Sequence, residues 1–379
     1  MQIVVAGAGV AGLAFTAALS ASDSEVTVLE GRSSGTAADG GAGIALLPNG
    51  LCALRALGVE EEVTDRGYQV KGFAIRDRRG KRLAGSRFAD KATGLCLRRS
   101  ALLGALLGQS AHAEVRFEDS LAAAEDSGPR VRLRTVGGCT RVADVLIGAD
   151  GLQSTVRRLI DDGALPRYRG YVEYRGIVPG SAGDLVAREI VEFHGRGVRV
   201  GVFGVASDAI GWWATVNEPL APGPDDAKTM LLERAGELPD VCGELIAAQD
   251  PAALLRTPIQ DLPALSAFAR GRILLLGDAA HAATPDLGQG AGLALEDAVV
   301  LGRLLLEPAE LQQTVKRYNA TRLKRAHAVQ RMARSLGSCG QWAGWPAGVR
   351  NMSLHLCPTR LLFAQTLALQ RYDPVRALA

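Results

Sequence analysis

The sequence predicts an α/β protein in which a Rossmann-like nucleotide-binding domain is interrupted by a β-rich insertion and followed by a helical C-terminal part. Three observations support this prediction. A strand–turn–helix–strand pattern fills the first 30 residues, two apolar runs end in glycine and aspartate, and short alternating segments rich in aromatic residues fill the middle. The chain has 379 residues, 47% hydrophobic and 22% charged, which fits two packed globular domains.

The first 30 residues are typical of a βαβ unit. An apolar strand at 3–6 precedes a Gly-rich turn, an Ala- and Leu-rich helix at 11–20 and a second strand at 25–29. In the turn, Gly7 permits the sharp bend, Gly9 lets the backbone approach a pyrophosphate, and Gly12 lets helix and strand pack closely. The phosphates would lie at the helix N-terminus, where backbone N–H groups are unpaired.

Glu30 ends the second strand, 18 residues beyond Gly12. Its carboxylate can accept hydrogen bonds from a ribose diol and disfavours a 2′-phosphate, so this turn is not expected to hold NADPH. Two alternatives stay open at this point, because NAD-dependent dehydrogenases share the motif and a Gly-rich turn can be purely structural.

Further elements extend the nucleotide-binding part. A loop is predicted at 31–43, a helix begins at Pro48-Asn49-Gly50 and is closed by Gly58, and another helix covers 98–109. Strands at 142–147 and 272–276 end in Gly148-Ala149-Asp150-Gly151 and Gly277-Asp278. Ligands bind at such carboxyl strand ends in open α/β sheets.

The middle of the chain, from about 168 to 261, is predicted to be β-rich. Segment 189–205 alternates as antiparallel strand, 210–216 forms another strand, and 219–226 is a Pro/Gly/Asp loop, whereas the chain from 291 onward is mostly helical. We therefore assign 1–70, 95–167 and 265–379 to a discontinuous nucleotide-binding domain, and 71–94 and 168–264 to a β-rich substrate domain.

Two longer motifs narrow the cofactor. One runs from Gly148 to Arg157, and the other runs from Gly277-Asp278-Ala279-Ala280-His281 through Pro285 and Gly288-Gln289-Gly290 to Glu296-Asp297-Ala298. With the N-terminal turn, their order and spacing resemble the class A, para-hydroxybenzoate-hydroxylase-like FAD-dependent aromatic monooxygenases over nearly the whole chain. The resemblance implies a glutathione-reductase-type FAD-binding domain. An NAD-dependent dehydrogenase would not explain the last motif.

The resemblance assigns roles around FAD. Asp278 would bind the ribityl hydroxyls, although aspartate there could also cap a helix. Asp150, Gly151 and Arg157 would lie near the pyrophosphate, although Arg157 could be an ordinary surface residue. Either Arg98 or Arg99, in an Arg-x-x-Leu pattern, would contact phosphate or ribityl oxygens. The remaining residues that we expect at FAD are Val10, Ala11, Gly31, Arg32, Gly43, Ile44, Gly277, Pro285, Gly288, Gly290 and Ala291.

The candidate catalytic segment is Pro285, Gly288, Gln289 and Gly290. Proline would form a rigid wall near the flavin ring, and the N–H groups that open the helix 291–306 would face the N1/C2=O edge, where they would stabilise anionic reduced flavin. Gly292 stands where the family usually has Asn. His281 is expected to hold the turn rather than to catalyse, and Ser154 lacks the surroundings of a nucleophile elbow.

Substrate contacts are expected from the β-rich segment. The candidates are Tyr174, His194, Arg199, Trp212 and Trp213, with Arg175, Phe193, Phe203 and Asn217 as further possibilities. Each could instead be an ordinary core residue of the sheet. Because strand side chains alternate, Trp212 and Trp213 should point to opposite faces of a regular strand, so at most one of them should line the pocket.

We therefore expect an FAD-dependent monooxygenase that uses NAD(P)H and O2, through a flavin C4a-hydroperoxide, to hydroxylate an aromatic, heteroaromatic or polycyclic small molecule. A flavin epoxidase or reductase acting on an alkene such as an isoprenoid, and a non-redox enzyme with FAD as a scaffold, remain alternatives. The net charge of +3 without basic clusters argues against nucleic acid. We expect no metal, no membrane span, a cytoplasmic monomer or homodimer, and six reduced cysteines.

Overall fold

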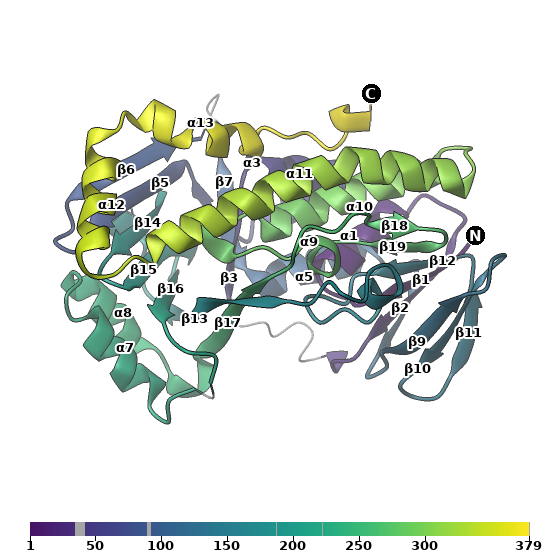
Figure 1. Ribbon diagram of the computed structural model, residues 1–379, viewed down its shortest axis with the longest axis horizontal. Helices are drawn as coiled ribbons and strands as arrows, with labels where there is room; N and C mark the ends of the chain where they lie inside the picture. Colours follow the sequence, from purple (N-terminus) through teal and green to yellow (C-terminus); the bar gives the residue numbers. More distant parts are fainter. Residues whose placement is uncertain (35–41, 89–91, 187, 222, 379) are drawn as a thin grey trace.

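The computed structural model describes residues 1–34, 42–88, 92–186, 188–221 and 223–378. Two large sheets stand at opposite ends of the molecule, and the long helices α10 (Gly290–Leu306) and α11 (Leu311–Gly340) extend along it (Figure 1). No helix in this described part is long and apolar enough to cross a membrane. The predicted mixed α/β fold with a β-rich insertion and a helical C-terminal part is confirmed.

The nucleotide-binding part is built on a six-stranded sheet of order β18-β19-β12-β1-β2-β8. The central strand β1 runs parallel to both β2 and β12, as a βαβ unit requires. Its strands are β1 (Gln2–Ala6), β2 (Glu25–Glu30), β8 (Glu114–Phe117), β12 (Val145–Gly148), β18 (Ala269–Arg270) and β19 (Ile273–Leu275).

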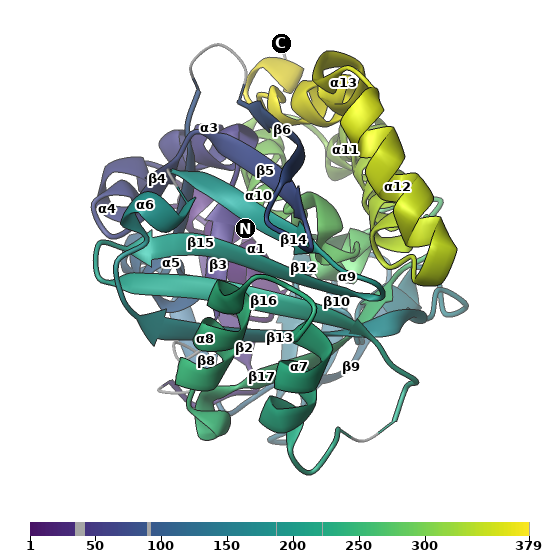
Figure 2. The same ribbon diagram turned by 90° about the vertical axis from the view of Figure 1, so that its left-hand side faces the viewer.

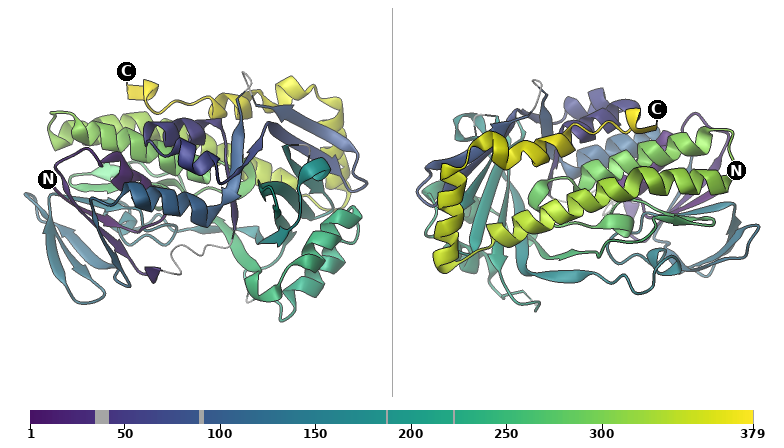
Figure 3. Two further views of the ribbon diagram at one scale, coloured as in Figure 1. Left: turned by 180° about the vertical axis from the view of Figure 1, so that it is seen from behind. Right: turned by 45° about the horizontal axis from the view of Figure 1, so that its top comes forward.

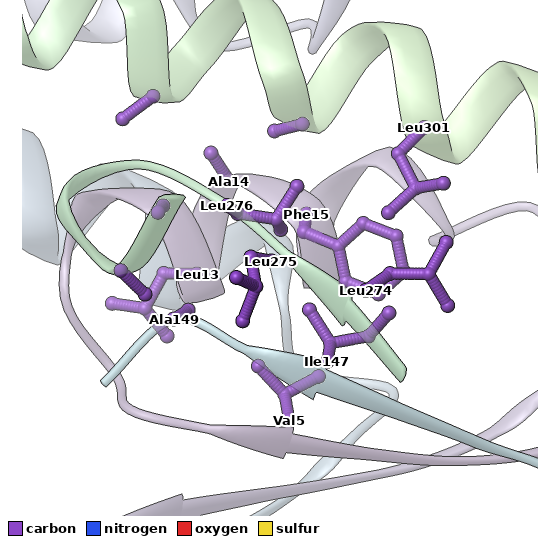
Figure 4. Packing of buried hydrophobic residues seen from close by; sticks show 14 of the residues in the cluster. Val5, Leu13, Ala14, Phe15, Ile147, Ala149, Leu274, Leu275, Leu276 and Leu301 are labelled. Atoms are coloured by element: carbon purple, nitrogen blue, oxygen red, sulfur yellow. The ribbon is translucent and has the colours of Figure 1, made fainter. Parts of the chain in front are cut away.

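Apolar side chains on both faces explain why this sheet is buried. Helix α1 (Val10–Ala18) packs on α10, and the fully buried ring of Phe15 lies among leucines of β19 and α10 (Figure 4). Val5 and Ile147, from the paired strands β1 and β12, complete this layer. Parallel strands covered on both faces read as continuous apolar runs, which is why these strands were visible in the sequence.

Two predictions in this part need correction. The strand predicted at 142–147 is two strands, because the chain turns at Asp144 from β11 (Thr140–Ala143) into β12. Strand β11 belongs to a small antiparallel sheet with β9 (Leu121–Asp126) and β10 (Val131–Thr135). The loop predicted at 31–43 lies mostly outside the described residues, and its last residue already begins β3 (Gly43–Leu46).

The second large sheet has the order β17-β13-β16-β15-β14-β5-β6 and faces the viewer in Figure 2. The segment predicted as one antiparallel strand at 189–205 is the hairpin β14–β15, and β14 also pairs in parallel with β5. The strands are β5 (Gly72–Asp77), β6 (Arg82–Arg87), β13 (Arg167–Pro179), β14 (Glu189–His194), β15 (Val198–Ala206), β16 (Ala209–Asn217) and β17 (Leu255–Asp261).

The two faces of this sheet pack differently. Helices α7 (Ala227–Ala235) and α8 (Asp240–Ala248), which were not predicted from the sequence, cover one face and bury Trp212. The other face carries Phe203 and Trp213 toward the nucleotide-binding part. Strands β5 and β6 share this sheet with β13–β17, in keeping with the assignment of 71–94 and 168–264 to one domain, although the domain boundaries remain a prediction.

The remaining elements join the two sheets. A three-stranded sheet of β3, β4 (Tyr68–Val70) and β7 (Gly94–Arg98) lies between them, flanked by α3 (Pro48–Ala56), α4 (Glu60–Thr64) and α5 (Arg99–Gln109). After α11, helices α12 (Gly344–Leu356) and α13 (Thr359–Gln370) return along the outside of the molecule (Figure 3). All six cysteines are unpaired.

Candidate functional site

One cavity of about 940 Å³ extends from the N-terminal turn to the inner face of the second large sheet. Glu30 and Arg32 line one part of it, Gly9, Arg99 and Asp278 another, and the loop around Pro285 lies where the second sheet begins. Most of the predicted site residues border this cavity. The exceptions are Gly12, Arg98, Arg157, Tyr174, Gly277 and Gln289.

The N-terminal turn has the conformation that its glycines were expected to allow. Gly7 has φ of +104°, and an added Cβ would lie 2.4 Å from the Ala149 carbonyl oxygen. A Cβ on Gly12 would lie 1.9 Å from the Gly7 carbonyl oxygen, so this glycine permits the close packing behind the cavity wall. Gly9 differs, because nothing lies within 4 Å of its Cβ position. Its backbone therefore borders space that a phosphate can occupy.

Glu30 lies at the end of the cavity as an ionised carboxylate. It accepts hydrogen bonds from the backbone N–H groups of Ala8 and Arg32, both at 2.9 Å, and from the Arg32 guanidinium. Burial raises the pKa of Glu30, but these hydrogen bonds outweigh burial and hold it below its usual value. A ribose diol would have to displace the Arg32 guanidinium, whose side chain is 41% exposed.

Arg99, and not Arg98, lines the cavity. Arg98 is exposed at the end of β7, whereas Arg99 begins α5 and its side chain has no hydrogen-bond or ion-pair partner among the described residues. Burial, together with the nearby charges of Arg32 and Arg175, lowers the pKa of Arg99. An unpaired guanidinium confined beside two other cations creates a positive potential, which favours an anionic ligand.

The second motif has one member at the cavity and one behind it. Asp150 lines the cavity and accepts hydrogen bonds from Ser154 and the Thr155 N–H, so it shapes its own turn. The Arg157 side chain is buried and donates to the carbonyl oxygens of Leu152, Ala164 and Ala279. Arg157 is therefore neither a surface residue nor a lining residue, and it ties the second motif to the third.

In the third motif, Asp278 lines the cavity and Gly277 does not. Gly277 itself is the N-cap of the short helix α9 (Asp278–His281), with φ of +57°, so the capping role considered for Asp278 is not observed. Loss of solvation at this site raises the pKa of Asp278, and this effect outweighs the nearby charges of His281 and Arg99, which lower it. His281 is buried away from the cavity, 2.6 Å from Asp297, which also accepts from the Gly277 N–H.

The loop from Pro285 to Gly290 is held from the nucleotide-binding side by an amide pair. Asn49, at the start of α3, donates to Gln289 at 2.8 Å and to Glu296 at 2.7 Å, and Gln289 donates back to Asn49 at 3.2 Å. A Cβ on Gly292 would lie 2.8 Å from the Asn49 amide nitrogen, so glycine leaves room for this pair. Gln289 therefore positions the loop instead of facing the cavity.

The same loop presents backbone groups to the cavity. Pro285 begins the 3-10 turn η4 (Pro285–Leu287), and Gly288 follows with φ of +62°. Helix α10 begins at Gly290, and no atom lies within 4 Å of the Cβ position there. The first N–H groups of a helix lack intrahelical partners, so those of Gly290 and Ala291 are available at the cavity wall.

A buried ionic network forms the polar wall on the second sheet. Arg199 donates to Glu192 at 2.8 Å, to Asp286 at 2.5 Å and to Gln341 at 2.8 Å, and Tyr171 donates to Asp286 at 2.5 Å. Burial raises the pKa of Glu192, but the charges of Arg199 and His194 outweigh it and lower that pKa to about 2. Asp286 lies between two predicted residues, yet no pattern in the sequence singled it out.

The aromatic wall comes from the same strands. Trp213 packs on Phe203 with ring centroids 5.5 Å apart, and both residues line the cavity. Trp212 also borders the cavity, but its indole lies in the core beneath α7 and α8, where it donates to Gln249. The two tryptophans face opposite sides of the sheet as expected, but both residues line the cavity, so the expectation that at most one of them would do so is wrong.

Other substrate candidates are divided by the same alternation. His194, Arg175 and Arg199 line the cavity, and Arg175 pairs with the buried Glu173 at 3.2 Å. Tyr174 and Phe193 lie in the core beneath α7 and α8. The Asn217 side chain instead donates to the Gln341 carbonyl oxygen.

Part of the cavity wall comes from the C-terminal helices, where no motif pointed. Leu336 of α11 and Phe363, Thr366 and Gln370 of α13 line the cavity, and Phe363 packs edge-on against Phe73 at 4.7 Å. The spacing of three and four residues on α13 is the only sequence signal of this inward face, and it is common to any amphipathic helix.

These features fit a bound dinucleotide. Gly9 leaves space beside unpaired helix N–H groups, Arg99 supplies an unpaired cation, and Asp278 offers a carboxylate farther along the cavity. In the part of the chain that the structure describes, no group of three or more His, Cys, Asp or Glu side chains could hold a metal ion.

Comparisons with known proteins agree with this interpretation. Residues 1–333 match the family model described as FAD binding domain. The chain is 31% identical to aurachin C monooxygenase/isomerase of Stigmatella aurantiaca, over 99% of both chains. It is 32% identical to FAD-dependent urate hydroxylase of Klebsiella pneumoniae, over 88% of this chain and 89% of that one.

Solved structures give the same result. The crystal structure of Klebsiella pneumoniae HpxO complexed with FAD and uric acid superimposes with a TM-score of 0.80 and 27% identity, covering 99% of this chain and 94% of that one. The resemblance inferred from the three motifs is thereby confirmed. The chain belongs to the FAD-binding-domain family of flavin-dependent aromatic monooxygenases, and FAD is its cofactor.

Proposed function

We propose that this enzyme uses NAD(P)H and O2 to hydroxylate a small aromatic or heteroaromatic molecule beside the Pro285–Gly290 loop. The observation that carries the proposal is that one cavity joins two surfaces. The first is lined by Gly9, Arg99 and Asp278 and fits FAD. The second, which we call the chamber, lies against the second large sheet and has an aromatic wall with Phe203 and Trp213 and an ionic wall around Arg199. One relative is named a urate hydroxylase and another an aurachin C monooxygenase/isomerase, and urate is a nitrogen heterocycle, which supports this substrate class.

The residues of this chain would bind, orient and shield. The N–H groups that open α1, together with Arg99, would hold the pyrophosphate region, and Asp278 would hold the ribityl chain. The N–H groups of Gly290 and Ala291 would stabilise negative charge at the ring edge. When bound, FAD supplies hydride acceptance and oxygen activation, while Phe203, Trp213 and Phe363 exclude water.

The charges of the chamber favour a neutral or phenolic substrate over a carboxylate. Arg199 is matched by Glu192 and Asp286, and Arg175 is matched by Glu173. A substrate carboxylate would therefore meet guanidinium groups that are already paired, and it would be repelled by the acidic partners. A hydroxyl or ring N–H can instead exchange hydrogen bonds with these groups.

The same polar wall bears on the alternatives. An alkene such as an isoprenoid needs an apolar chamber, and a buried ionic network beside it would gain nothing from the substrate. Epoxidation or reduction of an alkene is therefore less well supported than hydroxylation of a polar aromatic ring. We also propose the domain division 1–70, 95–167 and 265–379 against 71–94 and 168–264, with the chamber between the two.

A substrate screen tests the function. The FAD-loaded protein should oxidise NADH or NADPH faster with hydroxylated heterocycles or phenols than with matching benzoates, and the product should be heavier by one oxygen atom. Turnover without O2 would favour a reductase, and turnover without NAD(P)H would favour a non-redox enzyme. Consistent preference for carboxylated rings would contradict the substrate class proposed here.

A further inference from the structure

The outer face of α12 is apolar and exposed. Trp345, Val349, Met352 and Leu356 are 81%, 40%, 57% and 71% exposed, and their spacing of four, three and four residues places them on one side of the helix. We call these four residues the α12 face. Helix α12 stands at the outer edge of the molecule in the views of Figures 1 and 2. A contiguous apolar surface of this kind marks an interaction site.

Helices α12 and α13 carry no negative charge. Neither helix contains an aspartate or glutamate, and because Arg350 of α12 is buried, Arg360 of α13 is their exposed cation. The exposed Arg360 follows shortly after Leu356, and Leu361, which is 76% exposed, extends the apolar surface onto α13. An exposed apolar helical face with tryptophan and no acidic residue suits a helix that lies in a membrane interface, where nearby cations add attraction to anionic lipids.

A second cavity lies directly beside the α12 face. It has a volume of about 430 Å³, and Arg78, Arg196, Trp345 and Asn351 line it. Arg78 and Arg196 are exposed, and their guanidinium groups form no ion pair within the described part of the chain, although the Arg196 backbone N–H donates to the Glu237 carboxylate. The buried His194 also lines this cavity, and its Nδ1 has no hydrogen-bond partner there. The two guanidinium groups give this cavity a positive wall that can receive an anion.

We propose that the α12 face and this cavity together form a docking surface for an anionic lipid membrane. The apolar side chains would enter the headgroup–acyl boundary with α12 lying in the membrane plane. A lipid phosphate would occupy the cavity between Arg78 and Arg196, with Trp345 at the level of the headgroups. Charge complementarity selects this occupant, because a second copy of this chain would bring the same cations to face one another.

Helix α13 contributes both to the wall of the main cavity and, through Leu361, to the exposed apolar surface. The inner face of α13, with Phe363, Thr366 and Gln370, lines the main cavity, and α13 follows α12 directly in the chain. A helix with its side chains is about 10–12 Å across. Docking would therefore bring the chamber close to the lipid surface. The proposal concerns membrane binding and does not depend on the proposed oxidation.

Vesicle binding by the FAD-loaded protein tests the apolar part. The protein should co-sediment with vesicles that contain phosphatidylglycerol and bind phosphatidylcholine vesicles much less. The variant Trp345→Ser/Met352→Ser/Leu356→Ser should bind at least roughly tenfold more weakly. The matched control is Val136→Ser/Leu165→Ser/Leu220→Ser, because these residues are 70%, 62% and 59% exposed elsewhere. It should bind like the parent, and FAD content shows whether each variant folds.

A second pair of variants tests the anion site. Arg78→Ser/Arg196→Ser should abolish the preference for phosphatidylglycerol, whereas Arg132→Ser/Arg134→Ser, which removes two exposed arginines of β10, should not. Absence of vesicle binding by the parent overturns the proposal. It is also overturned if each control variant loses as much vesicle binding as the docking-surface variant with which it is paired. Protection by inorganic phosphate alone, without vesicle binding, would mark a free-anion site instead. A dimer that the α12 variant converts to monomer, again without vesicle binding, would mark an interface between copies.

Discussion

The contrast between Arg98 and Arg99 gives the sharpest test of the cofactor site. Arg99 is an unpaired guanidinium in the cavity, and its lowered pKa shows that the charge is unfavourable there without a ligand. Arg99→Gln should therefore leave the apo-protein at least as stable as the parent. It removes one charge-assisted hydrogen bond to FAD, worth about 1.5–3 kcal/mol, so the Kd for FAD should rise roughly 10- to 150-fold.

The measurement is a titration of apo-protein with FAD, followed by flavin fluorescence, for Arg99→Gln and Arg98→Gln side by side. Arg98 is exposed outside the cavity, so its substitution should leave the Kd within about twofold. High salt should weaken FAD binding in the parent more than in Arg99→Gln, because the lost contact is ionic. Equal effects at the two positions, or an unchanged Kd for Arg99→Gln, would refute the assignment of Arg99 to the cofactor.

Three further substitutions probe the supports of the site. Arg157→Ala should cost about 3 kcal/mol in urea unfolding, because it strands buried carbonyl groups, while the folded variant still binds FAD. Glu192→Gln should lower the free energy of unfolding by about 3 kcal/mol at pH 7, because Arg199 lowers the pKa of Glu192 in the folded protein. This difference from the parent should vanish as the pH falls from about 4.5 toward 2, and urea unfolding at several pH values checks it. Gln289→Ala should cost about 1–3 kcal/mol, and a double-mutant cycle with Asn49→Ala should show coupling above about 0.5 kcal/mol.

Most residues predicted to bind FAD line the cavity, because this part of its wall is made by local backbone geometry. The positive φ of Gly7 and the contact behind Gly12 belong to one βαβ unit, and adjacent parallel strands bring Asp150 and Asp278 to the same edge of the sheet. Short-range chain geometry and strand order are what a motif encodes. The choice between Arg98 and Arg99 needed the structure, because one residue decides whether the side chain lies on the strand or the helix.

The chamber could not be predicted in this way, because its members meet through long-range contacts. Asn49 and Gln289 are 240 residues apart, and Asp286 in the turn η4 reaches Arg199 on β15 of the second large sheet. In the sequence, Asp286 looks like an ordinary solvent-exposed loop carboxylate. Only the structure shows that it is paired with the buried Arg199. Helices α7 and α8 were missed for a related reason: their few apolar positions gain meaning only against the sheet that they cover.

The loop from Pro285 to Gly290 joins these two kinds of site, and its attachments suggest how they communicate. Asp286 is bonded to Arg199 on the substrate sheet, whereas Gln289, three residues later, is bonded to Asn49 on the nucleotide side. Pro285 stiffens the first turn, and Gly288, which lies between the two anchored residues, has a left-handed φ of +62°. A ligand that rearranges the Arg199 network would act on Asp286 and thereby on the backbone leading to Gly290. The N–H groups expected at the flavin edge are thus placed by a network that need not touch the flavin.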